Sequence, residues 1–90
     1  MNNLNKLRTK INELDSQIIE LLCKRFELAK IIGEMKFVNG VTGIRDIKRE
    51  QEILETITCQ YAANIHEVYQ KLFEISVRIQ EEEVAVIKGR

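Results

Sequence analysis

The stretch LLCKRFELAKIIGEMK, from Leu21 to Lys36, decides how the first part of this 90-residue chain folds. Apolar residues recur within it and before it at alternating steps of four and three, which places them on one face of an α-helix. The series is Leu7, Ile11, Leu14, Ile18, Leu21, Leu28, Ile32 and Met35. Arg25 occupies the step between Leu21 and Leu28 that has no apolar residue. The stretch therefore predicts an amphipathic helix that carries a cation on its apolar face.

Residues that interrupt helices are scarce in the rest of the chain. The sequence has no proline, and two of its four glycines lie in NGVTG, residues 39–43, which we expect to form a turn. Helices are expected over residues 4–38, 46–63 and 65–87. Asp46 is the expected N-cap of the second helix, and no strand pattern is found. The sequence thus predicts a single all-α domain over residues 1–90 with a long first helix.

The first helix is too long to be covered by its own chain. About 35 residues give a helix roughly 50 Å long, whereas a compact domain of this size has a radius of gyration near ~12 Å. The apolar series on this helix is sustained from Leu7 to Met35. A second copy packing along it would bury that face, so we expect an intertwined homodimer.

Composition narrows the classes of partner and compartment. The 14 basic residues balance the 14 acidic ones, which argues against a nucleic-acid or membrane-surface partner. Neither a secretion signal nor an apolar run long enough to span a membrane is found. Cys23 and Cys59 form no CxxC pair, and no cluster of metal ligands is apparent, so we expect a cytoplasmic protein without a metal.

Polar residues interrupt the apolar face of every predicted helix. Lys36 lies eleven residues after Arg25, which is about 20° away on a helical wheel. Glu50 interrupts the second helix, and Ser76 interrupts the third, with Gln80 one turn later. Each residue alone has an ordinary structural explanation, such as an ion pair, a snorkelling side chain or a bond to its own helix. Because a buried unpaired charge costs several kcal/mol, three interrupted helices together suggest one shared cavity filled by a ligand.

The charges of these residues indicate the kind of ligand. Arg25, Lys36 and Arg49 are cations, and Arg49 lies in the first turn of the second helix, where backbone N–H groups also favour anions. An arginine binds a carboxylate through two parallel hydrogen bonds. A small molecule with several negative groups is therefore expected, and Glu50 would accept from a hydroxyl or amino group on it. Arg8 is about 25 Å from Arg25 along the helix, so it could reach the cavity only from a second copy.

In combination, these motifs resemble the all-helical chorismate mutases of the AroQ type. The resemblance covers nearly the whole chain, from LRTKINELDSQIIELLCKRFELAKIIGEMK through RDIKREQEIL to SVRIQ. It implies a three-helix protomer in an intertwined homodimer and an isomerase that uses no cofactor. The implied reaction is the rearrangement of chorismate, a dicarboxylate, to prephenate in aromatic amino-acid biosynthesis.

The resemblance also implies a role for each polar residue. The substrate carboxylates would be held by Arg25, Arg8 of the partner chain, Arg49 and Ser76. Lys36 would lie between a carboxylate and the ether oxygen of the enolpyruvyl group, and Gln80 would donate to the same oxygen. Glu50 and the backbone at Asp46 would receive the ring hydroxyl. The apolar wall would be formed by Ile32, Phe73 and Val77.

Several alternatives remain open on the sequence alone. Aligning SVRIQ with the family selects Gln80, whereas an ungapped alignment of the preceding residues shifts its equivalent toward Val84. The same fold serves isochorismate pyruvate lyases and aminodeoxychorismate mutases, which act on similar anionic substrates. A helical dimerisation module without catalytic activity would keep the apolar faces but would not need Lys36 or Gln80.

Overall fold

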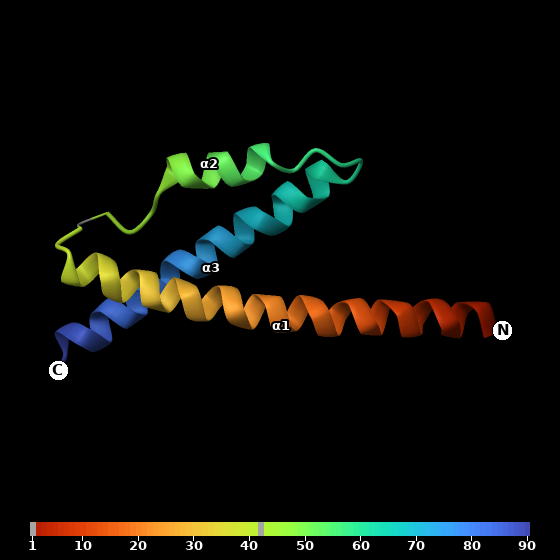
Figure 1. Ribbon diagram of the computed structural model, residues 1–90, viewed down its shortest axis with the longest axis horizontal. Coiled ribbons are helices and arrows are strands. Elements are labelled where there is room, and N and C mark those ends of the chain that lie inside the picture. The colour runs from red at the N-terminus through yellow and green to blue at the C-terminus, as the bar shows by residue number, and fades with distance from the viewer. Residues whose placement is uncertain (1, 42) are drawn as a thin grey trace.

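The computed structural model describes residues 2–41 and 43–90, with the backbone alone for Asn2. The described chain folds into three α-helices and no strand: α1 (Asn2–Val38), α2 (Ile47–Glu55) and α3 (Ala62–Lys88). The all-α class and the long first helix are thus confirmed. Thr42, in the predicted turn at residues 39–43, lies outside the described residues. In Figure 1, α1 is one long arm, and α3 crosses its C-terminal half while α2 runs above α3.

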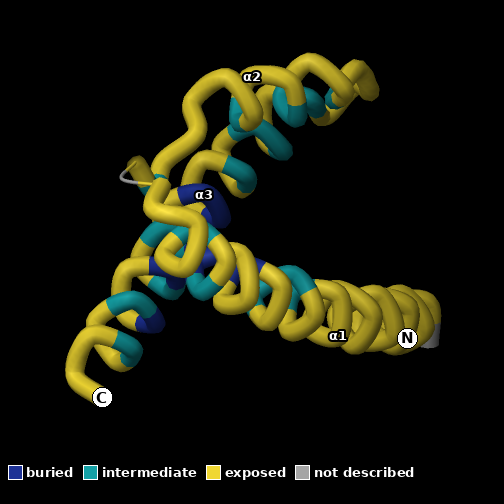
Figure 2. The backbone as a smooth tube through the Cα atoms, turned by 60° about the vertical axis from the view of Figure 1, so that its left-hand side comes forward, coloured by how far each residue is buried: buried dark blue, intermediate teal, exposed yellow. Residues whose placement is uncertain are grey.

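The core of the molecule lies where α3 crosses α1. Its buried apolar residues are Ala29, Leu72 and Phe73, and Figure 2 shows the buried positions gathered at this crossing. The two helices approach each other closely at Gly33, where a Cβ atom would lie only 2.9 Å from Cα of Gln80. The absence of a side chain at Gly33 therefore allows the two helices to come close enough for α3 to meet the interrupted face of α1.

The second helix is shorter than the predicted segment 46–63. It ends at Glu55, and α3 begins at Ala62, three residues before the expected start. The β-branched run Thr56, Ile57 and Thr58 follows at once, and such residues lose side-chain freedom in a helix. The Thr56 hydroxyl donates to the carbonyl of Ile53 at 2.6 Å. A turn therefore replaces the second half of the expected helix.

His66, on α3, stabilises the end of α2. Its Nε2 atom lies 3.1 Å from the carbonyl oxygen of Leu54. Because a carbonyl oxygen only accepts, Nε2 must be the donor in this hydrogen bond. The histidine thus adds a side-chain donor to a carbonyl of the last turn of α2, which also accepts from the backbone N–H of Ile57 at 3.1 Å.

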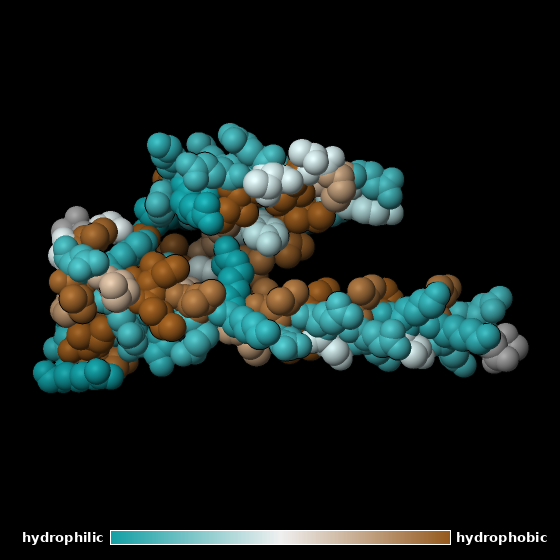
Figure 3. Space-filling view, viewed as in Figure 1, coloured by the Kyte–Doolittle hydropathy of each residue, from teal (hydrophilic) through white to brown (hydrophobic). Residues whose placement is uncertain are grey.

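The described chain is extended and leaves most of α1 uncovered. Its radius of gyration is 16.9 Å and its dimensions are 57 × 29 × 13 Å. The N-terminal half of α1 extends away from α2 and α3 in both views (Figures 1 and 2). It carries a row of exposed apolar side chains, called here the apolar seam: Leu7, Ile11, Leu14, Ile18 and Leu21. Figure 3 shows apolar side chains along the upper edge of the free arm of α1, which faces the gap between this arm and the part of the molecule formed by α2 and α3. Among the described helices, none combines the length and apolarity needed to cross a membrane.

Candidate active site

A cleft of about 460 Å³ opens between the three helices. Seven of the eight polar residues predicted from the sequence line it: Arg25, Lys36, Asp46, Arg49, Glu50, Ser76 and Gln80. The remaining lining residues are apolar: Leu28, Ala29, Ile32, Ile44, Ile53, Phe73 and Val77. The predicted wall residues Ile32, Phe73 and Val77 are among them. The polar interruptions of the three apolar faces thus meet in one place.

Arg25 reaches the cleft from α1 and is held by side chains of α3. Its Nη1 atom donates to Oγ of Ser76 at 2.7 Å. Its guanidinium carbon lies 5.7 Å from the ring centroid of Tyr69 and 5.9 Å from that of Phe73, within the range of cation–π attraction. The two rings pack edge to face, with centroids 5.8 Å apart. The cation on the apolar face is therefore partnered, and its orientation is fixed from the α3 side.

Lys36 lines the cleft from the last turn of α1, eleven residues after Arg25. Its Nζ atom donates to the carbonyl oxygen of Ile44, in the segment that leads into α2. An ammonium group has three donors, so this contact anchors the side chain and leaves capacity for a ligand. Lys36 thereby also ties the end of α1 to the start of α2.

Gln80 projects into the cleft from α3, one turn after Ser76. Gln80 is only 8% exposed, and its Oε1 atom accepts no hydrogen bond from the described residues. Val84, the position selected by the alternative alignment, is not among the lining residues. The register of α3 therefore brings Ser76 and Gln80 to the cleft together.

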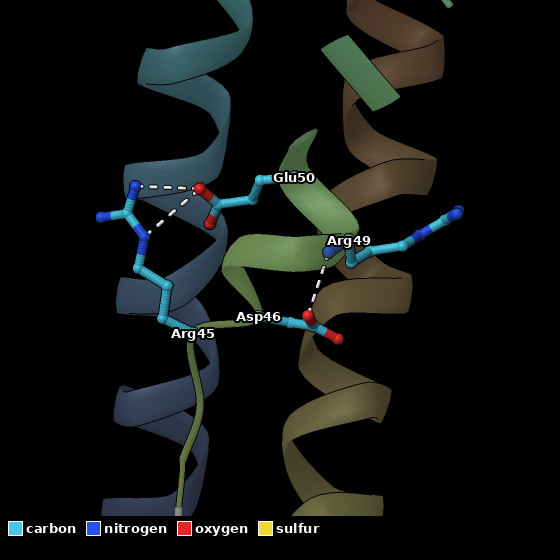
Figure 4. Close-up of polar contacts among 4 residues, drawn as sticks. All are labelled: Arg45, Asp46, Arg49 and Glu50. Carbon is cyan, nitrogen blue, oxygen red and sulfur yellow. Dashed lines mark hydrogen bonds and ion pairs between the residues drawn. The ribbon is translucent and has the colours of Figure 1, made fainter. Parts of the chain in front are cut away.

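The first turn of α2 supplies the remaining polar groups (Figure 4). Asp46 is the N-cap, as predicted, since its Oδ1 accepts from the backbone N–H of Arg49 at 3.0 Å. Glu50 accepts from Arg45, with Nη2 at 2.9 Å and Nε at 3.3 Å from its Oε1. The Arg49 side chain extends away from Glu50 and lies 3.8 Å from Glu52. Arg49 therefore lines the cleft, but its guanidinium is largely in solvent.

Two residues of this site were missed by sequence reasoning. Tyr69 lies seven residues before Ser76 and so on the same side of the third helix, but an aromatic residue at that spacing gives no sign of a contact with Arg25. Arg45 precedes the helix and belongs to no periodic pattern. Its one sequence signal is its position immediately before the N-cap, from which a long side chain can reach the first helical turn.

Arg8 is the predicted residue that the fold does not bring to the cleft. It lies in the exposed N-terminal half of α1, and it is absent from the lining. The separation of about 25 Å along the helix from Arg25 follows from the helical rise. Within one copy of the chain, the residues lining the cleft therefore include the cations Arg25 and Lys36, together with Arg49, whose guanidinium is largely in solvent, and two carboxylates.

Comparisons with known proteins point in the same direction as this geometry. The family profile of chorismate mutase type II matches residues 7–81. The chain is 38% identical over 85 residues to the bifunctional chorismate mutase/prephenate dehydratase of Buchnera aphidicola subsp. Schizaphis graminum, covering 88% of this chain and 22% of that protein. For the protein of the same name from Escherichia coli K12, the identity is 35% over 86 residues, covering 89% of this chain and 22% of the relative.

A shorter relative was also found. The chorismate mutase of Methanocaldococcus jannaschii is 39% identical over 54 residues, which cover 60% of this chain and 54% of the relative. The chain spans only about a fifth of the length of the bifunctional relatives. No solved structure matches the chain at a significant level. Since the family profile covers most of the chain, from the apolar seam to the residue after Gln80, the chain belongs to the chorismate mutase type II family.

Proposed function

We propose that this chain is a chorismate mutase, an isomerase that rearranges chorismate to prephenate for aromatic amino-acid biosynthesis. The observation that carries the proposal is the gathering of Arg25, Lys36 and Gln80 in one cleft over an apolar wall. Chorismate carries two carboxylates, which suit the cations, and an apolar ring face, which suits the wall. The reaction makes one carbon–carbon bond and breaks one carbon–oxygen bond within the same molecule.

The first task of the site is to hold the reactive conformer. Chorismate must fold its enolpyruvyl arm over the ring before the two carbons can bond, and clamping both carboxylates favours this compact shape. Arg25 would grip one carboxylate, because its guanidinium is already oriented by Ser76 and the aromatic pair. Arg49 and Ser76 would assist. Favourable contacts with the bound carboxylates would thereby offset the entropy that the substrate loses in the compact shape.

The second task is to stabilise charge that appears in the transition state. Negative charge grows on the ether oxygen as the carbon–oxygen bond lengthens. Donors aimed at that oxygen accelerate the reaction only to the extent that they bind the transition state more strongly than the substrate. Lys36 and the amide nitrogen of Gln80 would be these donors. The burial of Gln80 supports this role, since a donor held in a water-poor cleft acts through a lower local dielectric.

The ring hydroxyl would be received at the start of α2. Glu50 can accept a hydrogen bond from it, and the backbone at Asp46 lies in the same turn. These contacts would orient the ring so that its reactive carbon faces the enolpyruvyl arm. Glu50 would therefore act in binding and orientation.

We further propose that the working molecule is a homodimer in the cytoplasm. A second copy packed antiparallel along the apolar seam would cover side chains that are each more than half exposed here. The same arrangement would carry Arg8 of each copy toward the cleft of the other, where it would bind the second carboxylate. Two composite sites per dimer would result. The exposed free thiols of Cys23 and Cys59 are consistent with a reducing compartment.

The test is to incubate the purified protein with chorismate, follow the loss of its ultraviolet absorption and identify the product by chromatography. Prephenate at a rate far above the uncatalysed one is expected. Release of pyruvate would instead identify a lyase. No consumption of chorismate by the folded protein would contradict the proposal and leave a dimerisation module.

A further inference from the structure

Arg45 contacts the carboxylate of Glu50 from outside the cleft. Two of its nitrogens, Nη2 at 2.9 Å and Nε at 3.3 Å, reach the same oxygen, Oε1 (Figure 4). Both hydrogen bonds are to Oε1, so Oε2, the second oxygen, accepts none from Arg45. The Arg45 side chain is 51% exposed and is not part of the cleft lining, whereas the Glu50 side chain is only 14% exposed.

The backbone holds this pair in a fixed relation. Asp46 directly follows Arg45 and caps α2, accepting from the N–H of Arg49 through its side chain and from the N–H of Glu50 through its carbonyl, both at 3.0 Å. Arg45 is thus anchored to the same helical turn that carries Glu50. Because the backbone next to Arg45 and at Glu50 is already ordered, only side-chain freedom is lost when the pair forms.

The pair of Arg45 and Glu50 also affects the charge that a ligand would meet in the cleft. Two carboxylates line the cleft of one copy, and an uncompensated carboxylate at Glu50 would repel a ligand with two negative groups. Arg45 supplies a positive charge directly behind Glu50. Because the Arg45 side chain does not line the cleft, it supplies this charge without filling the cleft.

We propose that Arg45 is a positioning residue of the site, acting through Glu50. It holds Oε1 so that Oε2 is presented to the ring hydroxyl of the substrate, and it offsets the charge of Glu50 against the substrate carboxylates. The inference rests on the proposed function. Arg45 touches no reacting atom, and its effect is carried entirely by the carboxylate that it holds.

The first test is the kinetics of Arg45→Met with chorismate. We expect kcat/KM to fall about fivefold, the size of effect that a partly exposed charged pair supports. The loss should lie mainly in KM, because the hydroxyl contact and the repulsion are present in the bound substrate as well as in the transition state. Arg45→Lys should recover part of the loss. The matched control is Lys48→Met, which removes an exposed charge from the same turn and should change kcat/KM less than twofold.

The second test separates positioning from a general structural effect. If Arg45 acts through Glu50, Arg45→Met should cost less than twofold in a Glu50→Gln background, since the carboxylate it holds is gone. An equal loss in both backgrounds would overturn the proposal. So would an Arg45→Met variant with unchanged KM.

The third test does not depend on turnover. A crystal structure of Arg45→Met should show the Glu50 carboxylate displaced from the position in Figure 4. An unmoved carboxylate would overturn the proposal whatever the activity. Failure of the natural protein to convert chorismate would instead count against the proposed function, and the crystal structure would then decide the role of Arg45 alone.

Discussion

At the scale of single residues, Arg25 shows why a helix turns a guanidinium toward its own core. The side chain is half-buried, bonded to Ser76 and placed over two aromatic rings. A hydrogen bond to a charged group contributes about 1.5–3 kcal/mol, which offsets part of the loss of hydration. The guanidinium is therefore tolerated on the apolar face and is oriented for a carboxylate.

Replacing Arg25 by leucine should separate function from stability. We expect Arg25→Leu to lower the rate with chorismate at least about a hundredfold, because one carboxylate loses its anchor. The midpoint of thermal unfolding should be unchanged or higher, since leucine completes the apolar face and no charge needs to be desolvated. Circular dichroism and the chorismate assay measure both. Arg78→Leu, an exposed position on α3, is the control. A variant that unfolds without ligand would make Arg25 a structural residue.

Lys36→Ala should affect the chemical step most strongly. Removing one preorganised donor costs on the order of 3 kcal/mol in the barrier, roughly a hundredfold in rate. We expect this loss in kcat with the helical content retained. Lys24→Ala, which removes an exposed lysine of α1 paired with Glu20, should leave kcat unchanged. Equal rates for Lys36→Ala and the natural protein would exclude the electrostatic role.

Several polar residues of the cleft could be predicted because they break a periodic pattern. Arg25, Glu50 and Ser76 are visible against the apolar positions around them, and helical geometry then places them on inward faces. Arg45 could not be found this way, since it lies in a loop without periodicity. Tyr69 could not either, because an aromatic residue on an apolar face fits the pattern and gives no sign of the cation beside it.

At the scale of elements, the crossing of α1 and α3 depends on Gly33. Alanine gains about 1 kcal/mol over glycine in helix propensity, but its Cβ would lie 2.9 Å from Cα and 3.1 Å from the carbonyl oxygen of Gln80. Overpacking of this kind costs about 1–3 kcal/mol. The steric cost should exceed the gain in propensity, because the nearest atoms belong to the backbone of α3.

Gly33→Ala should therefore lower both stability and activity. We expect a decrease of about 1 kcal/mol in the free energy of unfolding, measured by urea denaturation, and a lower kcat because Gln80 is moved. Gly43→Ala is the matched control, since an added Cβ there would meet no atom of the described residues within 4 Å apart from its chain neighbours. A Gly33→Ala protein that is more stable than the natural one would show that the helices adjust without strain.

The bounds of α2 show what periodicity fails to predict. Its start followed from Asp46, whose capping role depends on local chemistry alone. Its end did not, because Ile57 and Tyr61 continue the apolar spacing beyond Glu55 and suggest a longer helix. The β-branched run and the hydrogen bonds of Thr56 and His66 decide the end. The His66 contact joins residues twelve apart in the chain, on two different helices, and cannot be seen in a local pattern.

At the scale of the whole molecule, the extended shape agrees with the length of the first helix read from the sequence. The radius of gyration of 16.9 Å exceeds the ~12 Å expected of a compact chain of this size. The apolar seam is exposed along the half of α1 that no other part of the described chain covers (Figure 2). Burying it against an identical seam would remove a large apolar area from water, and this is the main driving force for association.

The central claim is that each cleft, completed by Arg8 of a second copy, rearranges chorismate. The measurement that tests it most directly is the rate of prephenate formation by a 1:1 mixture of Arg8→Ala and Arg25→Ala chains, unfolded and refolded together. Each variant alone should be nearly inactive. Random pairing makes half of the dimers mixed, each with one intact site, so the mixture should recover about one quarter of the natural rate. A mixture as inactive as its components, or an Arg8→Ala protein with the natural rate, would contradict the claim.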